Sequence, residues 1–270
     1  MKKWIDILVL SLALFCGAWT CRAQLDSLNK VKLTNLLEEY YEALLPESLD
    51  VKEAEFDDVI ASCTAPEVRS FVAHSILKHY MDPPLMGEEA VAIHVYEKWF
   101  LPGDAGIKDE WEQFEAELFY RFNHQSMLDA PAPVLNIKSG CKLVKVPSSG
   151  RPCVIYFYDT SCAKCKLVTP QLPAALQLVQ FDMDFFAVYA GEDEAAWREF
   201  RRNFKAETPH VKVIHLWDKD MESDYQMKYG VTSTPKLFFV DRSGTIQGRR
   251  LDAESLKQLI SIYNLYYVEE

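Results

Sequence analysis

The chain has 270 residues, of which 49% are hydrophobic and 26% charged. This composition is typical of a globular protein with one or two domains, and it excludes a disordered, collagen-like or low-complexity chain. The formal net charge is −11, from 29 basic and 40 acidic residues, so we expect no nucleic-acid partner.

The N-terminus has the pattern of a cleavable secretory signal. A basic start precedes an uncharged, mostly apolar run over 7–19, and the small residues Cys21 and Ala23 stand at the −3 and −1 positions of a cleavage site. The run is shorter than the ~20 residues of a membrane-spanning helix. We therefore expect residues 1–23 to be removed and the remaining chain to be exported to the periplasm. An uncleaved membrane anchor facing the periplasm and a lipoprotein stay open as alternatives.

Residues 24–128 show the three- and four-residue spacing of amphipathic helices. The expected helices are 33–44, 55–62, 66–80, 88–100 and 109–122. An aromatic stripe in the last helix is expected to lie in the core: Trp111, Phe114, Leu118 and Phe122. Since the segment contains no strand pattern, it is expected to form a smaller all-α domain, which covers one side of the following domain or mediates dimerisation.

Two prolines, Pro131 and Pro133, mark a semi-rigid connector at the start of a second domain, residues 129–270. The expected strands are 134–137, 142–146, 153–158, 181–190, 211–217, 236–240 and 245–249, and the expected helices are 163–179, 194–204, 222–229 and 253–263. This alternation predicts an α/β domain with a central sheet covered on both faces.

The chemistry is expected at Cys162-Ala163-Lys164-Cys165, where a buried strand ends and a helix begins. Unpaired N–H groups and the macrodipole at a helix start favour an anion, so the first cysteine is the more readily ionised and nucleophilic. The positive charge of Lys164 favours the same thiolate. In an exported chain, where disulfides persist, this unit indicates thiol–disulfide exchange. A purely structural disulfide is the alternative.

We expect no metal and no cofactor. A zinc site needs two more Cys or His ligands at matching spacing, and the six histidines offer no such set. Attachment of a c-type haem needs a histidine directly after the second cysteine, where Lys166 stands.

Two segments resemble signatures of the thioredoxin superfamily. Residues 156–170 contain the strand, the cysteine pair and Pro170, five residues after the second cysteine. Residues 229–246 contain Pro235, a following strand and an Asp-x-x-Gly turn. The proline connector and the turn at 139–140 resemble the exported TlpA/ResA-like branch. The resemblance extends from Ala130 to the C-terminus.

The resemblance implies an α/β thioredoxin-like fold, with a central mixed sheet flanked by helices, and a thiol–disulfide oxidoreductase. Cys162 would exchange with the substrate and Cys165 would resolve the mixed disulfide. Pro235 would be a cis-proline lying against the sulfurs, and the Thr234 backbone would pair with the extended substrate. The implied partners are protein thiols or disulfides, with a membrane electron donor needed if the protein is a reductant.

The chain departs from thioredoxin at positions expected to tune the pair. Ala163-Lys164 replaces Gly-Pro between the cysteines, and Tyr156 stands where thioredoxin has a buried aspartate that assists the second cysteine. The proton acceptor for Cys165 is therefore not identified. Asp159 is a candidate by proximity, and a solvated carboxylate that caps the helix is the alternative.

The other cysteines of the mature chain are less informative. Cys153 is expected to pack as a small buried hydrophobe, with a bridge to Cys141 as the alternative, and Cys63 is expected to be buried in the helical block.

Two other function classes stay open. A thiol peroxidase on a related fold would carry a Pro-x-x-x-Thr-x-x-Cys signature, which is not found, and a non-catalytic binding module would hold its cysteines in a structural disulfide.

Overall fold

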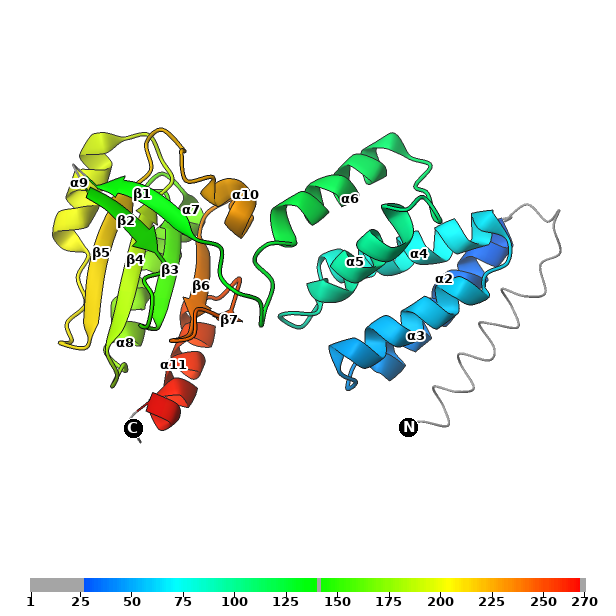
Figure 1. The fold of residues 1–270 in the computed structure, drawn as a ribbon, viewed down its shortest axis with the longest axis horizontal. Helices are drawn as coiled ribbons and strands as arrows, with labels where there is room; N and C mark the ends of the chain where they lie inside the picture. The colour runs from blue at the N-terminus through cyan, green and yellow to red at the C-terminus, as the bar shows by residue number, and fades with distance from the viewer. Residues whose placement is uncertain (1–26, 140–141, 268–270) are drawn as a thin grey trace. The chain divides into compact units, whose positions relative to one another are not determined.

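The computed structural model describes residues 27–139 and 142–267, and the chain divides into two compact units (Figure 1). The first unit ends at Tyr120 and the second begins at Arg121. The expected signal segment and Cys141 lie outside the described residues. Among the helices that are described, none combines the length and the apolar character needed to cross a membrane.

The first unit is built of helices, as the sequence predicts. They are α2 (Ser27–Leu44), α3 (Leu49–Ser62), α4 (Pro66–Met81), α5 (Glu89–Val95), a π-helical turn (Tyr96–Phe100) and α6 (Glu110–Asn123), which runs on into the second unit. The apolar faces of these helices enclose one core, in which Tyr40 and Phe56 meet edge to face with ring centroids 5.8 Å apart. An ion pair between Lys52 and Glu88 is buried beside this core.

The expectation that the aromatic stripe of α6 lies in the core is wrong for its first two residues, and Leu118 and Phe122 are only half-buried. Trp111 is 65% exposed and Phe114 is 48% exposed. The helix instead buries Ala116, and Phe119 packs against the core. Because 3.6 residues make a turn, Ala116 and Phe119 lie on a different face of the helix from Trp111 and Phe114.

The second unit contains a mixed five-stranded sheet in the order β5-β4-β3-β6-β7. Its strands are β3 (Cys153–Tyr158), β4 (Met183–Tyr189), β5 (Val211–Trp217), β6 (Lys236–Val240) and β7 (Ile246–Gly248). Strands β3, β4 and β5 are parallel, and β6 is antiparallel to both β3 and β7. A separate antiparallel hairpin joins β1 (Leu135–Ser139) and β2 (Lys142–Val146).

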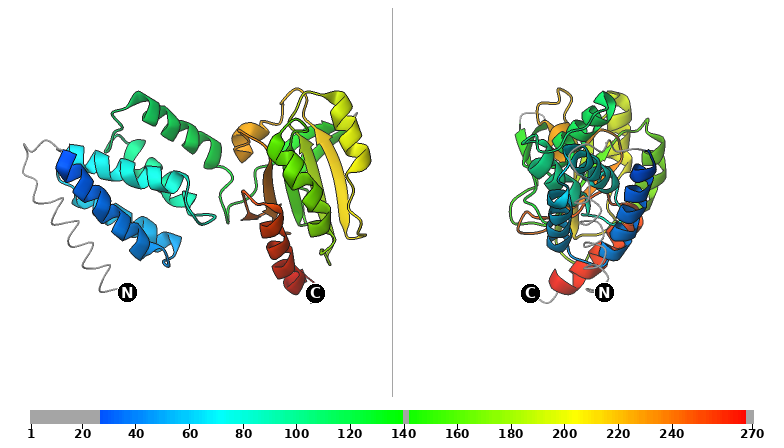
Figure 2. Two further views of the ribbon diagram at one scale, coloured as in Figure 1. Left: turned by 180° about the vertical axis from the view of Figure 1, so that it is seen from behind. Right: turned by 90° about the vertical axis from the view of Figure 1, so that its right-hand side faces the viewer.

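The two faces of this sheet have separate cores. The remaining helices are α7 (Ala163–Val168), α8 (Leu172–Leu176), α9 (Glu194–Asn203), α10 (Tyr225–Tyr229) and α11 (Ala253–Tyr267). Since side chains alternate along a strand, Tyr156 and Tyr158 of β3 pack on the face of α8 and α11, whereas Cys153 and Phe157 pack on the face of β1 and α10. Figures 1 and 2 show the hairpin and the helices α8 and α11 on opposite sides of the sheet.

The helix expected over 163–179 is interrupted. Helix α7 ends at Val168, a 3₁₀ turn covers Thr169–Gln171, and α8 runs only to Leu176. Pro170 has no N–H to donate to the preceding turn, so the α-helical hydrogen-bond ladder is interrupted there.

Candidate active site

The cysteine pair lies where the wholly buried strand β3 opens into α7. Cys162 is the N-cap of α7, with extended backbone (φ −67°, ψ 124°), and its Sγ accepts a hydrogen bond from the backbone N–H of Cys165 at 3.3 Å. The sulfur therefore occupies the position that a capping oxygen normally takes, facing N–H groups that have no partner within the helix. These N–H groups stabilise a negative charge on the sulfur.

A second segment, 72 residues further along the chain, completes the site. The Thr234–Pro235 peptide bond is cis, as the resemblance implies. The carbonyl oxygen of Thr234 accepts a hydrogen bond from the Cys162 thiol over 3.0 Å. The fold thus brings together both cysteines, Thr234 and Pro235, which the sequence selected as site residues.

The two thiols have opposite environments. Cys162 is half-buried, and this burial raises its pKa, but hydrogen bonds from the Thr234 side chain and from backbone groups of α7 outweigh the effect and lower the pKa. Cys165 is 2% exposed, and burial raises its pKa to about 11 despite opposing hydrogen bonds from Asp159 and Thr234. Of the pair, Cys162 is therefore the accessible, readily ionised thiol, and Cys165 is the protected one.

Comparison with known proteins identifies the domain family of this part of the chain. Residues 141–261 match the family model of the thioredoxin-like domain. The second unit is a thioredoxin-like domain. The match confirms the resemblance that the two sequence motifs indicate, and the mixed sheet confirms the predicted fold class.

One of the solved structures extends the likeness to most of the chain. A thioredoxin-like protein from Bacteroides caccae aligns over 94% of this chain and 93% of its own, with 12% identity and a TM-score of 0.67. The thioredoxin domain of a thiol-disulfide oxidoreductase from Bacteroides vulgatus covers 50% of this chain and 96% of its own, with 19% identity and a TM-score of 0.43. A putative thiol:disulfide interchange protein DsbE from Chlorobium tepidum covers 51% and 97%, with 19% identity and a TM-score of 0.40. No curated protein matches the chain.

The residues expected to tune the pKa of the two cysteines make different contacts. Ala163 and Lys164 are exposed in the first turn of α7, and Lys164 lowers the pKa of Cys162 through its backbone. Asp159 accepts hydrogen bonds from the backbone N–H of Ser161 at 2.7 Å and from the Ser161 hydroxyl at 2.9 Å. The Asp159 carboxylate therefore stabilises the loop that directly precedes the cysteine pair.

Tyr156 lies beneath the pair, fully buried on β3. Its hydroxyl is 2.7 Å from the hydroxyl of Thr169, and it also lies within hydrogen-bonding reach of Cys165. The sequence analysis did not select Thr169. The only local signal was a hydroxyl residue directly before the proline that breaks the helix.

The other described cysteines lie outside this site. Cys153 carries a buried free thiol on the opposite face of the sheet from Tyr156, and burial together with nearby Asp184 raises its pKa. Cys63 is fully buried in the helical unit. Within the described ranges 27–139 and 142–267, no cluster of three or more Cys, His, Asp or Glu side chains is arranged to hold a metal ion.

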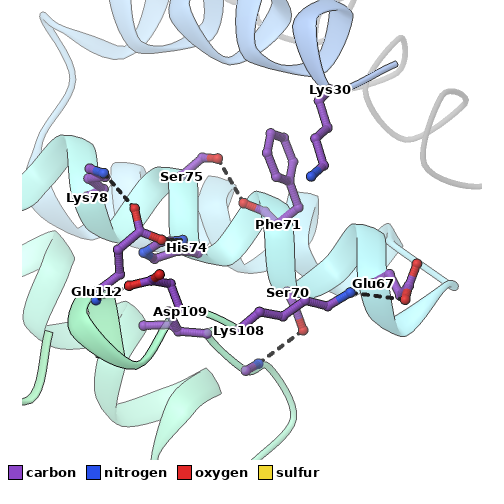
Figure 3. Close-up of a pocket in the computed structure, with 12 residues that line it drawn as sticks. Lys30, Glu67, Ser70, Phe71, His74, Ser75, Lys78, Lys108, Asp109 and Glu112 are labelled. Atoms are coloured by element: carbon purple, nitrogen blue, oxygen red, sulfur yellow. Dashed lines mark hydrogen bonds and ion pairs between the residues drawn. The ribbon is translucent and has the colours of Figure 1, made fainter. Parts of the chain in front are cut away.

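A cavity of about 400 Å³ lies in the helical unit between α4 and the start of α6 (Figure 3). Four of the charged side chains that line it form two ion pairs. Lys108 bonds to Glu67 at 3.1 Å and Lys78 to Glu112 at 2.8 Å. None of the described residues that line this cavity carries a thiol.

Proposed function

We propose that the protein is a thiol–disulfide oxidoreductase of the TlpA/ResA-like type, exported to the periplasm, which exchanges disulfides with protein thiols through Cys162 and Cys165. One observation carries the proposal. An accessible thiol of lowered pKa and a buried thiol of raised pKa are held three residues apart at a helix start, beside the Thr234 carbonyl. This asymmetry gives each sulfur a distinct role.

Each step of the exchange follows from this asymmetry. The Cys162 thiolate attacks a protein disulfide, so that a bond forms between Cys162 and one substrate sulfur while the other substrate sulfur leaves as a thiolate and takes up a proton. Cys165 then loses its proton and attacks Cys162. The enzyme disulfide forms, the mixed disulfide breaks, and the second substrate sulfur leaves. Two electrons pass from the enzyme dithiol to the substrate disulfide, and the reverse sequence oxidises a substrate dithiol.

The substrate is placed by the loop that carries the cis peptide bond. Thr234 and Pro235 stand directly beside Cys162, with the Thr234 carbonyl 3.0 Å from its sulfur. An extended substrate strand that pairs with the Thr234 backbone would bring its own sulfur to this point. Residues 24–128 would form a separate helical domain that narrows the choice of substrate for the domain at 129–270.

The first test is disulfide reduction with insulin, followed by turbidity. Cys162→Ser should abolish the activity, because no accessible thiolate remains. Cys165→Ser should instead accumulate a mixed disulfide at Cys162, visible by mass spectrometry, because the resolving sulfur is absent. Cys153→Ala, a change of a buried thiol outside the site, is the matched control. Full activity in Cys162→Ser would contradict the proposal.

The direction of exchange follows from the reduction potential of the pair, measured by thiol trapping across a glutathione series. A value near the ~−270 mV of thioredoxin would identify a reductant supplied by a membrane electron donor. A value between about −180 and −120 mV would identify an isomerase or an oxidant.

A further inference from the structure

The proposed exchange leaves one proton without a route. Cys165 must be deprotonated before it can attack the mixed disulfide, yet it is 2% exposed and its sulfur lies beneath the first turn of α7. The nearest carboxylate along the chain, Asp159, is engaged by two hydrogen bonds from Ser161. Some other group has to accept and pass on this proton.

Two hydroxyl groups, those of Tyr156 and Thr169, connect the buried sulfur with the outer part of the domain. The Tyr156 hydroxyl lies within hydrogen-bonding reach of Cys165 and 2.7 Å from the Thr169 hydroxyl, and either of the two hydroxyls can be the donor. Tyr156 is fully buried and Thr169 is half-buried, so the pair runs from the interior toward the surface.

Thr169, the outer residue of this pair, lines an open cavity. Thr169 lines a hollow of about 670 Å³ between the 3₁₀ turn after α7 and the end of α9. Glu199 and Glu207 line the same hollow, so the cavity that Thr169 lines also presents two carboxylates. A chain of hydroxyls that leads from a buried group to an open cavity is the arrangement that a proton relay needs.

We propose that Tyr156 and Thr169 form the proton path between Cys165 and this cavity. The Cys165 thiol gives its proton to the Tyr156 oxygen while the Tyr156 hydroxyl gives its own to Thr169. Thr169 in turn gives one to water in the cavity. The net change is one proton moved from sulfur to solvent, with both hydroxyls neutral before and after. The Tyr156 hydroxyl then donates to the thiolate that it has produced.

The raised pKa of Tyr156 suits a hydroxyl that passes a proton on without itself becoming ionised. Burial raises the pKa of Tyr156 well above its usual value, only partly offset by the hydrogen bond with Thr169. The titratable groups that act on Tyr156 are Cys165 and Cys162, and Tyr158 interacts with it from the same strand. A neutral phenol held between a thiol and a second hydroxyl can exchange protons with both without becoming charged.

This inference rests on the proposed function and is tested by separating the two chemical steps. One equivalent of DTNB (5,5′-dithiobis(2-nitrobenzoate)) releases a first thionitrobenzoate when Cys162 attacks and a second when Cys165 resolves the mixed disulfide. Tyr156→Phe should leave the first release within about twofold and slow the second at least about 100-fold, the lower end of the range for general acid–base catalysis. Thr169→Val should do the same, and Thr169→Ser should restore the rate.

Tyr158→Phe is the matched control. Tyr158 stacks on Tyr156 with ring centroids 5.4 Å apart, and its buried hydroxyl has no hydrogen-bond partner within the described part of the chain. Removing this hydroxyl should change neither release. The deficit of Tyr156→Phe should also shrink as the pH rises from 7 toward 9.5, because hydroxide then takes the proton directly, and a packing defect would not respond in this way.

The outcomes separate the two proposals. Equal rates of second release in Tyr156→Phe and Tyr158→Phe, or failure of Thr169→Ser to restore the rate, would overturn the relay and leave the oxidoreductase intact. An unchanged first release in Cys162→Ser would overturn the proposed function itself.

Discussion

Replacing Lys52 by methionine should remove about 3–5 kcal/mol from the stability of the helical unit, because it leaves a buried carboxylate without its counter-ion. The Lys52 side chain is 2% exposed and that of Glu88 is 6% exposed, and the two form an ion pair. The Lys52 ammonium also donates to the carbonyl of Leu45 at 3.2 Å. Methionine retains the length and packing of the lysine stem, so the change isolates the loss of the charge.

The magnitude follows from what each variant leaves behind. In Lys52→Met the Glu88 carboxylate keeps its desolvation cost and loses the attraction that offset it. In the double variant with Glu88→Leu no charge remains, and replacement of a whole buried pair is commonly neutral or stabilising by about 1–4 kcal/mol. The double variant should therefore be more stable than either single variant, a strongly non-additive cycle.

Cys63 provides an assay specific to this unit, because it is fully buried in the helical core. Maleimide labelling of Cys63 across a urea series, followed by peptide mass spectrometry, reports the free energy of opening the helical unit. A loss below about 1 kcal/mol in Lys52→Met, or a double variant as unstable as Lys52→Met alone, would refute the reasoning. Lys78→Met, which removes the exposed partner of Glu112, is the control and should cost less than about 1 kcal/mol.

Three further predictions follow from the described contacts. The rate at which iodoacetamide alkylates Cys162 should reach half its maximum at a pH below about 8.5, the pKa typical of a free thiol. Thr234→Val should move this midpoint pH upward. Gly230→Ala should lower the free energy of unfolding, measured by urea denaturation, by about 1–3 kcal/mol, because Gly230 has φ +59° and a Cβ there would clash with the Phe122 carbonyl oxygen. Burial lowers the pKa of His74 below its unfolded value of about 6.5, so its contribution to stability is present above that pH and is lost as the pH falls through the folded pKa. His74→Gln should therefore flatten the acid side of the stability profile measured by Cys63 labelling, and an unchanged profile would count against this assignment.

The elements of both units could be predicted because their signals are local. The buried strand before Cys162 and the helix after it follow from consecutive residues, and the expected helices of the first unit match α2 to α6. One helix was expected over 163–179, although the resemblance already marked Pro170 as a proline that kinks this helix. The exposure of Trp111 was not predicted because an apolar stripe does not say which face of a helix meets a core, and the helix buries Ala116 instead.

What the sequence by itself determined is the cysteine pair at a helix start, because the pair, the strand before it and the helix after it are consecutive residues. The cis-proline at Pro235 was implied by the resemblance to the thioredoxin superfamily. Only the tertiary structure decided their environments. The contact of Cys162 with Thr234 spans 72 residues, that of Lys52 with Glu88 spans 36, and that of Tyr156 with Thr169 spans 13. The helix start already favours ionisation of Cys162, but the contribution of Thr234 to its lowered pKa and the burial that protects Cys165 depend on the rest of the fold.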